Sequence, residues 1–178
     1  MRKILFLMIV CFSVYFITGC DKGIEPEPDK VVVEQTGFSG KVTFTGNWPS
    51  GIKRTHLFVF KNPIISSLDF AFSNLSFVVD SIPYRSTEFI INSPEQNYVA
   101  KNFLSSFDIP PGEHSYVMVA QSKTPEISFD RIDWVIVGVY DIGGDQSRPK
   151  TLTIQDGKMT TGVDIIVDFN NPPPQPPL

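Results

Sequence analysis

The sequence predicts an all-β fold, a β-sandwich of about seven or more antiparallel strands over residues 37–170. Apolar and polar residues alternate with a period of two in several short runs, and Gly, Pro, Asn and Ser clusters separate these runs. No stretch of about 12 or more residues has the 3.6-residue period of an amphipathic helix. The 15 Phe residues suit the faces of β-sheets, where aromatic side chains stabilise cross-strand pairs.

The expected strands differ in how many of their faces are apolar. Residues 162–169 place Val163, Ile165 and Val167 on one face, whereas residues 133–141 are apolar on both faces, as in a central strand. Trp134 lies in this two-faced run and is predicted to be a core residue. The predicted strands lie within residues 37–46, 55–62, 76–82, 87–92, 115–121, 133–141 and 162–169.

Two other segments of the chain are less regular. Residues 62–97 are longer than a simple sandwich needs, and we expect one or two extra strands or a long side loop there. Residues 171–178, NPPPQPPL, are mostly proline, which cannot donate ladder hydrogen bonds. They are predicted to form a disordered, exposed polyproline II tail.

The amino-terminal 19 residues predict a lipoprotein signal peptide. Arg2 and Lys3 precede an apolar run over residues 4–17, which is too short to cross a bilayer core as a helix. The run ends in Ile17-Thr18-Gly19-Cys20, a quartet that resembles the lipobox of bacterial lipoproteins. The resemblance implies cleavage before Cys20 and acylation at this residue, and two or three acyl chains suffice for stable anchoring. An ordinary secretory signal with a free Cys20 thiol is the alternative.

The chain that follows the cleavage site is acidic and is expected to contain no disulfide. Removal of Arg2 and Lys3 leaves 13 basic against 19 acidic residues, a net charge of −6, so no nucleic-acid partner is predicted. Cys11 leaves with the signal peptide and Cys20 carries lipid. Residues 21–30 are polar and contain proline, so residues 20–36 are predicted to comprise the lipidated cysteine and a flexible tether to one folded domain.

Turn and strand patterns within residues 37–169 resemble those of carboxypeptidase-regulatory-like, prealbumin-like domains. The resemblance rests on GFSGKVTFTGNWPSGIKRTHLFVFK at residues 37–61 and IPPGEHSYVMVAQ at residues 109–121. It rests further on residues 133–141 and 152–169, which look like the closing strands of longer versions in bacterial lipoproteins. The resemblance implies a transthyretin-like or immunoglobulin-like sandwich that serves as an accessory, binding or spacing module without an active site.

The sequence predicts no enzyme, no catalytic residue, no metal and no cofactor. His56 and His114 are isolated and no thiol accompanies them, whereas zinc sites use three or four ligands. There is no G-x-S-x-G elbow, no G-x-G-x-x-G and no Walker A motif. Asp141 and Asp145 flank two glycines, as in an oxygen-rich Ca²⁺ loop, but the loop lacks the D-x-D-x-D-G pattern and is better explained as a solvated turn.

Two residues are candidate sites besides Cys20, which is the predicted lipid attachment site. Trp48 stands next to Pro49 in a turn, where an exposed ring would stack on a sugar; packing over the end of the sandwich is the alternative. Ser81 follows Asp80 and precedes Ile82, and this triplet resembles an O-glycosylation acceptor used on exported proteins in some bacteria.

Two classes of function remain open. The first is a membrane-anchored cell-envelope lipoprotein that acts as a non-catalytic binding or assembly module, with a glycan or an envelope protein as its partner. The second is a structural spacer or accessory lipoprotein with no ligand of its own. The expected location is the outer membrane, on its periplasmic or surface side, in preference to the inner membrane, although Asp21 after the cysteine has opposite meanings in different bacteria.

Overall fold

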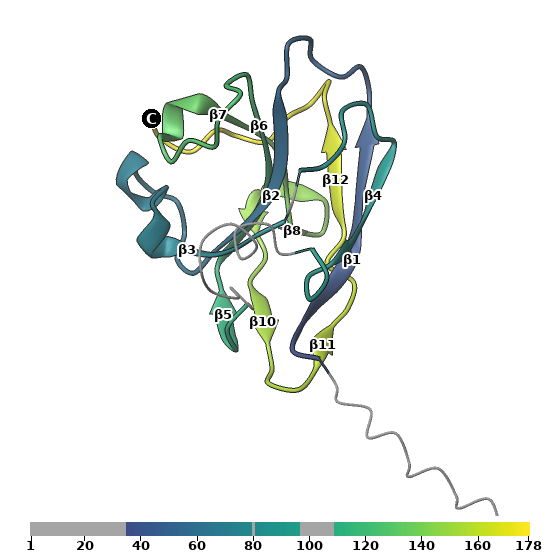
Figure 1. Ribbon diagram of the computed structural model, residues 1–178, viewed down its shortest axis with the longest axis vertical. Helices are drawn as coiled ribbons and strands as arrows, with labels where there is room; N and C mark the ends of the chain where they lie inside the picture. Colours follow the sequence, from purple (N-terminus) through teal and green to yellow (C-terminus); the bar gives the residue numbers. More distant parts are fainter. Residues whose placement is uncertain (1–34, 80, 97–108) are drawn as a thin grey trace, which may run out of the picture. The chain divides into compact units, whose positions relative to one another are not determined.

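The computed structural model describes residues 35–79, 81–96 and 109–178, all within the unit Glu34–Leu178. None of these residues lies in an α-helix; they form β-strands and three short 3₁₀ helices, which confirms the prediction of an all-β fold (Figure 1). The predicted signal peptide, the lipid attachment site Cys20 and residues 20–34 of the predicted tether lie outside the described residues.

The first sheet is built around the nine-residue strand β1 (Gly37–Thr45). Strand β4 (Glu88–Asn92) pairs with β1 in the antiparallel sense, whereas β11 (Met159–Thr160) and β12 (Ile165–Asp168) pair with it in parallel. We expected antiparallel strands throughout, so these two parallel pairings are a departure. They arise because the chain continues along the same side of β1 through β11 and β12, with an interruption at residues 161–164.

The second sheet has the strand order β3-β2-β6-β7, with all neighbours antiparallel. Strands β2 and β6 are in register over their whole length, and every residue of β6 is buried. The strands of this sheet are β2 (Arg54–Phe60), β3 (Leu75–Val78), β6 (Tyr116–Ser122) and β7 (Trp134–Val139).

Two small antiparallel pairs complete the strands among the described residues. Strand β5 (Gly112–His114) pairs with β10 (Leu152–Ile154), and β8 (Asp141–Ile142) pairs with β9 (Asp145–Pro149). Residues 62–97, where we expected extra strands or a side loop, contain β3 and β4 together with two of the 3₁₀ helices.

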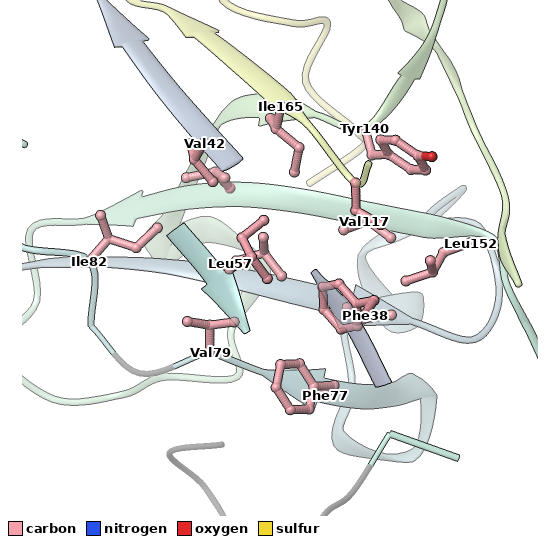
Figure 2. Packing of buried hydrophobic residues seen from close by; sticks show 14 of the residues in the cluster. Phe38, Val42, Leu57, Phe77, Val79, Ile82, Val117, Tyr140, Leu152 and Ile165 are labelled. Carbon is pink, nitrogen blue, oxygen red and sulfur yellow. The ribbon is translucent and has the colours of Figure 1, made fainter. Parts of the chain in front are cut away.

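The first core cluster contains buried apolar side chains from both four-stranded sheets (Figure 2). Strands β7 and β12 approach closely there: a Cβ atom added at Gly138 would lie 2.7 Å from a methyl carbon of Val167. Residues 163–168, which end in β12, alternate as predicted, with Val163, Ile165 and Val167 buried. The residues drawn and labelled are Phe38, Val42, Leu57, Phe77, Val79, Ile82, Val117, Tyr140, Leu152 and Ile165.

A second core cluster takes the other side chains of β2 and β6. Leu57 and Val59 belong to the first cluster and Phe58 and Phe60 to the second, as their alternation predicted. Trp134 is 1% exposed and belongs to the second cluster, which confirms its prediction as a core residue. The 3₁₀ helices that flank contributors to this cluster are η1 (Ser67–Asp69), η2 (Phe72–Asn74) and η3 (Arg131–Asp133).

Most residues of the proline-rich tail are exposed, as predicted, but the segment is also attached to the sheet. Pro173 is buried, and the side chain of Gln175 forms hydrogen bonds with both backbone groups of Ile136 on β7. Proline lacks a donor, but the glutamine side chain between the prolines supplies one, so the segment can still pair with a strand edge. Figure 1 shows this yellow segment leaving β12 and ending beside the coil of η3.

Candidate functional site

Trp48 is half-buried and packs against the first core cluster. Its ring lies 4.8 Å from that of Phe44 and 5.0 Å from that of Phe169, measured between centroids. The indole N–H donates a hydrogen bond of 3.1 Å to the carbonyl oxygen of Ser86. These contacts hold Trp48 as a cover over one end of the core, and they leave only part of its ring for a ligand.

The more exposed aromatic residue beside Trp48 is Tyr84, which the sequence analysis did not single out. Its side chain is 45% exposed, and its ring meets Trp48 edge to face at 5.5 Å. The phenol O–H donates to the carbonyl oxygen of Pro49 at 3.3 Å, so Tyr84 also joins the turn that carries Trp48. We call Trp48, Tyr84 and Arg85 the aromatic corner.

Arg85 holds an unusual backbone conformation in this corner. Its φ of 66° is the one positive φ of a non-glycine residue in the part of the chain that the structure describes. The N–H of Ser86 donates to the carbonyl oxygen of Pro83, which closes a β-turn with Arg85 in the position that normally favours glycine. The guanidinium carbon lies 5.3 Å from the centroid of Tyr84, within cation–π range.

Left-handed backbone in an arginine is unfavourable, and such strain gathers at functional sites. The corner therefore combines an exposed ring, a cation that contacts it and a strained turn. A planar ring with a flexible donor beside it suits the stacking and hydrogen bonding of a sugar or of a protein side chain. The signal for this corner in the sequence is the Pro-Tyr-Arg-Ser turn at residues 83–86.

Ser81 is exposed, in the segment between β3 and β4. It precedes the buried Ile82, while Asp80, the acidic residue of the proposed acceptor triplet, lies outside the described residues. Glycosylation of Ser81 stays a prediction.

The two histidines are buried separately, each with carbonyl or hydroxyl partners. His56 Nδ1 lies 3.1 Å from the carbonyl oxygen of Val79. His114 Nε2 lies 3.0 Å from the carbonyl oxygen of Pro110, and its Nδ1 lies 2.9 Å from the hydroxyl of Ser76. Because a carbonyl only accepts, the neutral His114 ring carries its proton on Nε2 and accepts from Ser76 at Nδ1.

Acid should destabilise the fold through His114. Desolvation of the buried ring lowers the pKa of His114 below its usual 6.5, and the positive charge of Lys61 lowers it further, against the raising effect of the Pro110 carbonyl. The unfolded chain therefore binds this proton first as the pH falls. His114 favours the folded state fully above pH 6.5, and this contribution is lost as the pH falls from there through the lower folded pKa.

Urea unfolding at neutral pH and at pH about 5 measures this loss. His114→Gln keeps a donor and an acceptor but does not titrate, so its free energy of unfolding should fall less between the two pH values. An equal fall in both proteins would contradict the assignment.

The loop that joins β8 and β9 uses its carboxylates within the turn. Asp141 Oδ1 accepts from the N–H of Gly144 at 2.6 Å, and Asp145 Oδ1 accepts from both the N–H and the hydroxyl of Ser147. The two hydrogen bonds from Ser147 lower the pKa of Asp145. Within residues 35–79, 81–96 and 109–178, no three or more His, Cys, Asp or Glu side chains are grouped to hold a metal ion.

A cavity of about 500 Å³ lies between the C-terminal segment and the start of β6. The Tyr116 side chain is 7% exposed, and desolvation raises the pKa of its phenol to about 12, so the group stays protonated at neutral pH. The lining residues are Pro63, Ile64, Ile65, Ser115, Tyr116, Gln146, Ser147, Pro149, Thr151, Pro174, Gln175 and Pro176. None of these side chains carries a charge at neutral pH.

Comparison with protein-family models, with curated proteins and with solved structures found no match to this chain. In the described part of the chain, no helix has the length and apolar character needed to cross a membrane.

Proposed function

We propose that this chain is a lipid-anchored lipoprotein of the cell envelope whose domain is a non-catalytic binding or assembly module. In this proposal residues 1–19 are cleaved, Cys20 carries the acyl chains and residues 20–36 form the tether to the outer membrane. The two sheets form a transthyretin-like or immunoglobulin-like sandwich, which holds loops at fixed positions for a partner.

The aromatic corner is the observation that supports a binding role best. Tyr84 is 45% exposed although it contacts Trp48, and Arg85 beside it keeps a left-handed backbone that a spacer would have no reason to retain. Trp48 then serves to position Tyr84 through their edge-to-face contact, and it carries less of the ligand contact than the sequence suggested. A glycan that stacks on Tyr84 is the partner that this chemistry favours.

Binding to a panel of neutral and acidic oligosaccharides, measured by calorimetry, tests the corner. Tyr84→Ala should weaken binding at least ten-fold, about 1.4 kcal/mol. Arg85→Gly should weaken binding but leave the free energy of unfolding unchanged or raise it by up to about 1 kcal/mol, because glycine relieves the left-handed strain. Phe129→Ala, the control, removes an aromatic side chain that is 42% exposed elsewhere and should leave oligosaccharide binding unchanged.

The anchor is tested separately, by cell fractionation. Cys20→Ser should move the protein out of the membrane fraction, because the thiol that would carry the diacylglyceryl group is gone. Retention of this variant in membranes would refute lipidation at Cys20. Wild-type protein that binds no oligosaccharide and captures the same envelope proteins as Tyr84→Ala would favour the spacer.

A further inference from the structure

The C-terminal segment is bound to the edge of β7 as a peptide ligand would be. Gln175 Oε1 accepts from the N–H of Ile136 at 2.9 Å, and Gln175 Nε2 donates to the carbonyl oxygen of Ile136 at 2.8 Å. One side-chain amide thus makes the pair of hydrogen bonds that a neighbouring strand would make. Pro173 is buried two residues earlier, and its carbonyl oxygen accepts a third bond from Gln175 Nε2 at 3.0 Å.

Arg131 holds the segment at a second point. This residue is 4% exposed, and its guanidinium donates to the carbonyl oxygen of Trp134 at 2.6 Å and to that of Pro176 at 3.0 Å. Its Nε has no hydrogen-bond partner, and among the described residues the one ion pair joins Lys41 and Glu88. A buried cation needs compensation, and here part of it comes from the backbone of the tail.

The covered edge is the outer edge of a sheet, since β7 is the last strand in the order β3-β2-β6-β7. Unpaired edges of this kind accept extended segments of other chains. Side-chain amides cover this one: Gln175 pairs with Ile136, and Gln146 Oε1 accepts from the N–H of Val139 at 3.0 Å. Pro174 to Pro176 also border the cavity of about 500 Å³, so the segment is packed tightly on one flank only.

We propose that the outer edge of β7, with Arg131, is a docking site for a Pro-Pro-Gln-Pro segment, and that a second copy of this chain can supply that segment by exchanging tails. Each copy carries one site and one matching segment, so a two-fold exchange keeps every contact described above. The exchange requires that the chain straighten at residues 170–172. There the N–H of Asn171 donates to the carbonyl oxygen of Asp168, and the N–H of Asn170 donates to Asp168 Oδ1.

The docking site is tested in the full chain by amide hydrogen exchange at Ile136. Gln175→Ala should speed exchange of this amide at least ten-fold, because the variant lacks the side-chain oxygen that accepts the hydrogen bond from the Ile136 N–H. A synthetic peptide of residues 169–178 added at millimolar concentration should restore the protection. The same peptide with Gln175→Ala should fail, and the peptide with Leu178→Ala should succeed, because Leu178 is 75% exposed. Gln175→Glu, which loses the Nε2 donor, serves as a second variant.

Exchange between copies is tested by sedimentation after refolding from urea at high protein concentration. Wild type and Leu178→Ala should contain a dimer fraction that the Gln175→Ala chain lacks. Failure of the wild-type peptide to restore protection would overturn the docking site. Peptide binding without any dimer would overturn the second copy as its occupant.

Discussion

Trp134→Ala is expected to destabilise the domain by about 3–5 kcal/mol, the range for deleting a large aromatic side chain from a packed core. The ring is 1% exposed and meets Phe58 edge to face at 4.9 Å between centroids. Its N–H donates to the carbonyl oxygen of Ser128 at 2.8 Å, so the substitution leaves a cavity and an unpaired carbonyl. Such a loss is a large part of the 5–15 kcal/mol that usually stabilises a domain.

Urea denaturation followed by circular dichroism measures the effect. Trp134→Phe keeps most of the packing and should lose clearly less than the alanine variant. Trp48→Ala, at a half-buried position, should also lose less free energy of unfolding than Trp134→Ala. A loss under about 1 kcal/mol for Trp134→Ala would mean that the second core cluster contributes little to stability.

Gly40→Ala should have the next largest effect, a loss of about 1–3 kcal/mol or more from overpacking. A Cβ atom added at Gly40 would lie 2.2 Å from the carbonyl oxygen of Val163. This oxygen belongs to the backbone, which cannot rotate away from the clash as the end of a flexible side chain can. Gly40 lies in β1 opposite Ile91 of β4, so the strand cannot shift either. Residues 161–163 would have to retreat, and they would carry the fully buried Val163 out of the core.

The neighbouring Lys41→Ala is the matched control. Its side chain is exposed and forms one ion pair of 3.9 Å with Glu88, and exposed pairs of this kind contribute about 0–1 kcal/mol. Thermal melts of the two variants should therefore separate clearly. Equal melting temperatures would show that residues 161–163 can shift to make room for the added methyl group without destabilising the fold.

The strands themselves were predictable from sequence because local alternation encodes them. β1 and β12 lie within runs whose period-two pattern identifies both the strand and its buried face, and β2 begins one residue before such a run. The parallel pairing of β1 with β12 was not predictable in this way. It joins residues more than 100 positions apart, such as Val42 and Ile165, and no local pattern specifies such a partner.

The candidate site was predicted only in part. Trp48 attracted interest because tryptophan next to proline in a turn is conspicuous, but its exposure depends on Phe44 and Phe169, which the sequence does not place beside it. Tyr84 contacts it from 36 positions away. The docking of the C-terminal segment was missed because composition predicts disorder, while the outcome depends on Gln175 and on the buried Arg131.

The burial of β2 and β6 on both faces has a consequence for strand register. In a sheet with one solvent-exposed face, a one-residue slip moves apolar side chains into water. The free-energy cost of that exposure specifies the register. Here a slip would keep Leu57 and Phe58 out of water and would merely exchange their clusters. Shape must then replace polarity as the discriminator: aliphatic Leu57 and Val59 fit one side, and the rings of Phe58 and Phe60 fit the other. Pairing in the wrong register would therefore be opposed mainly by poor side-chain packing, and only weakly by exposure of apolar surface to water.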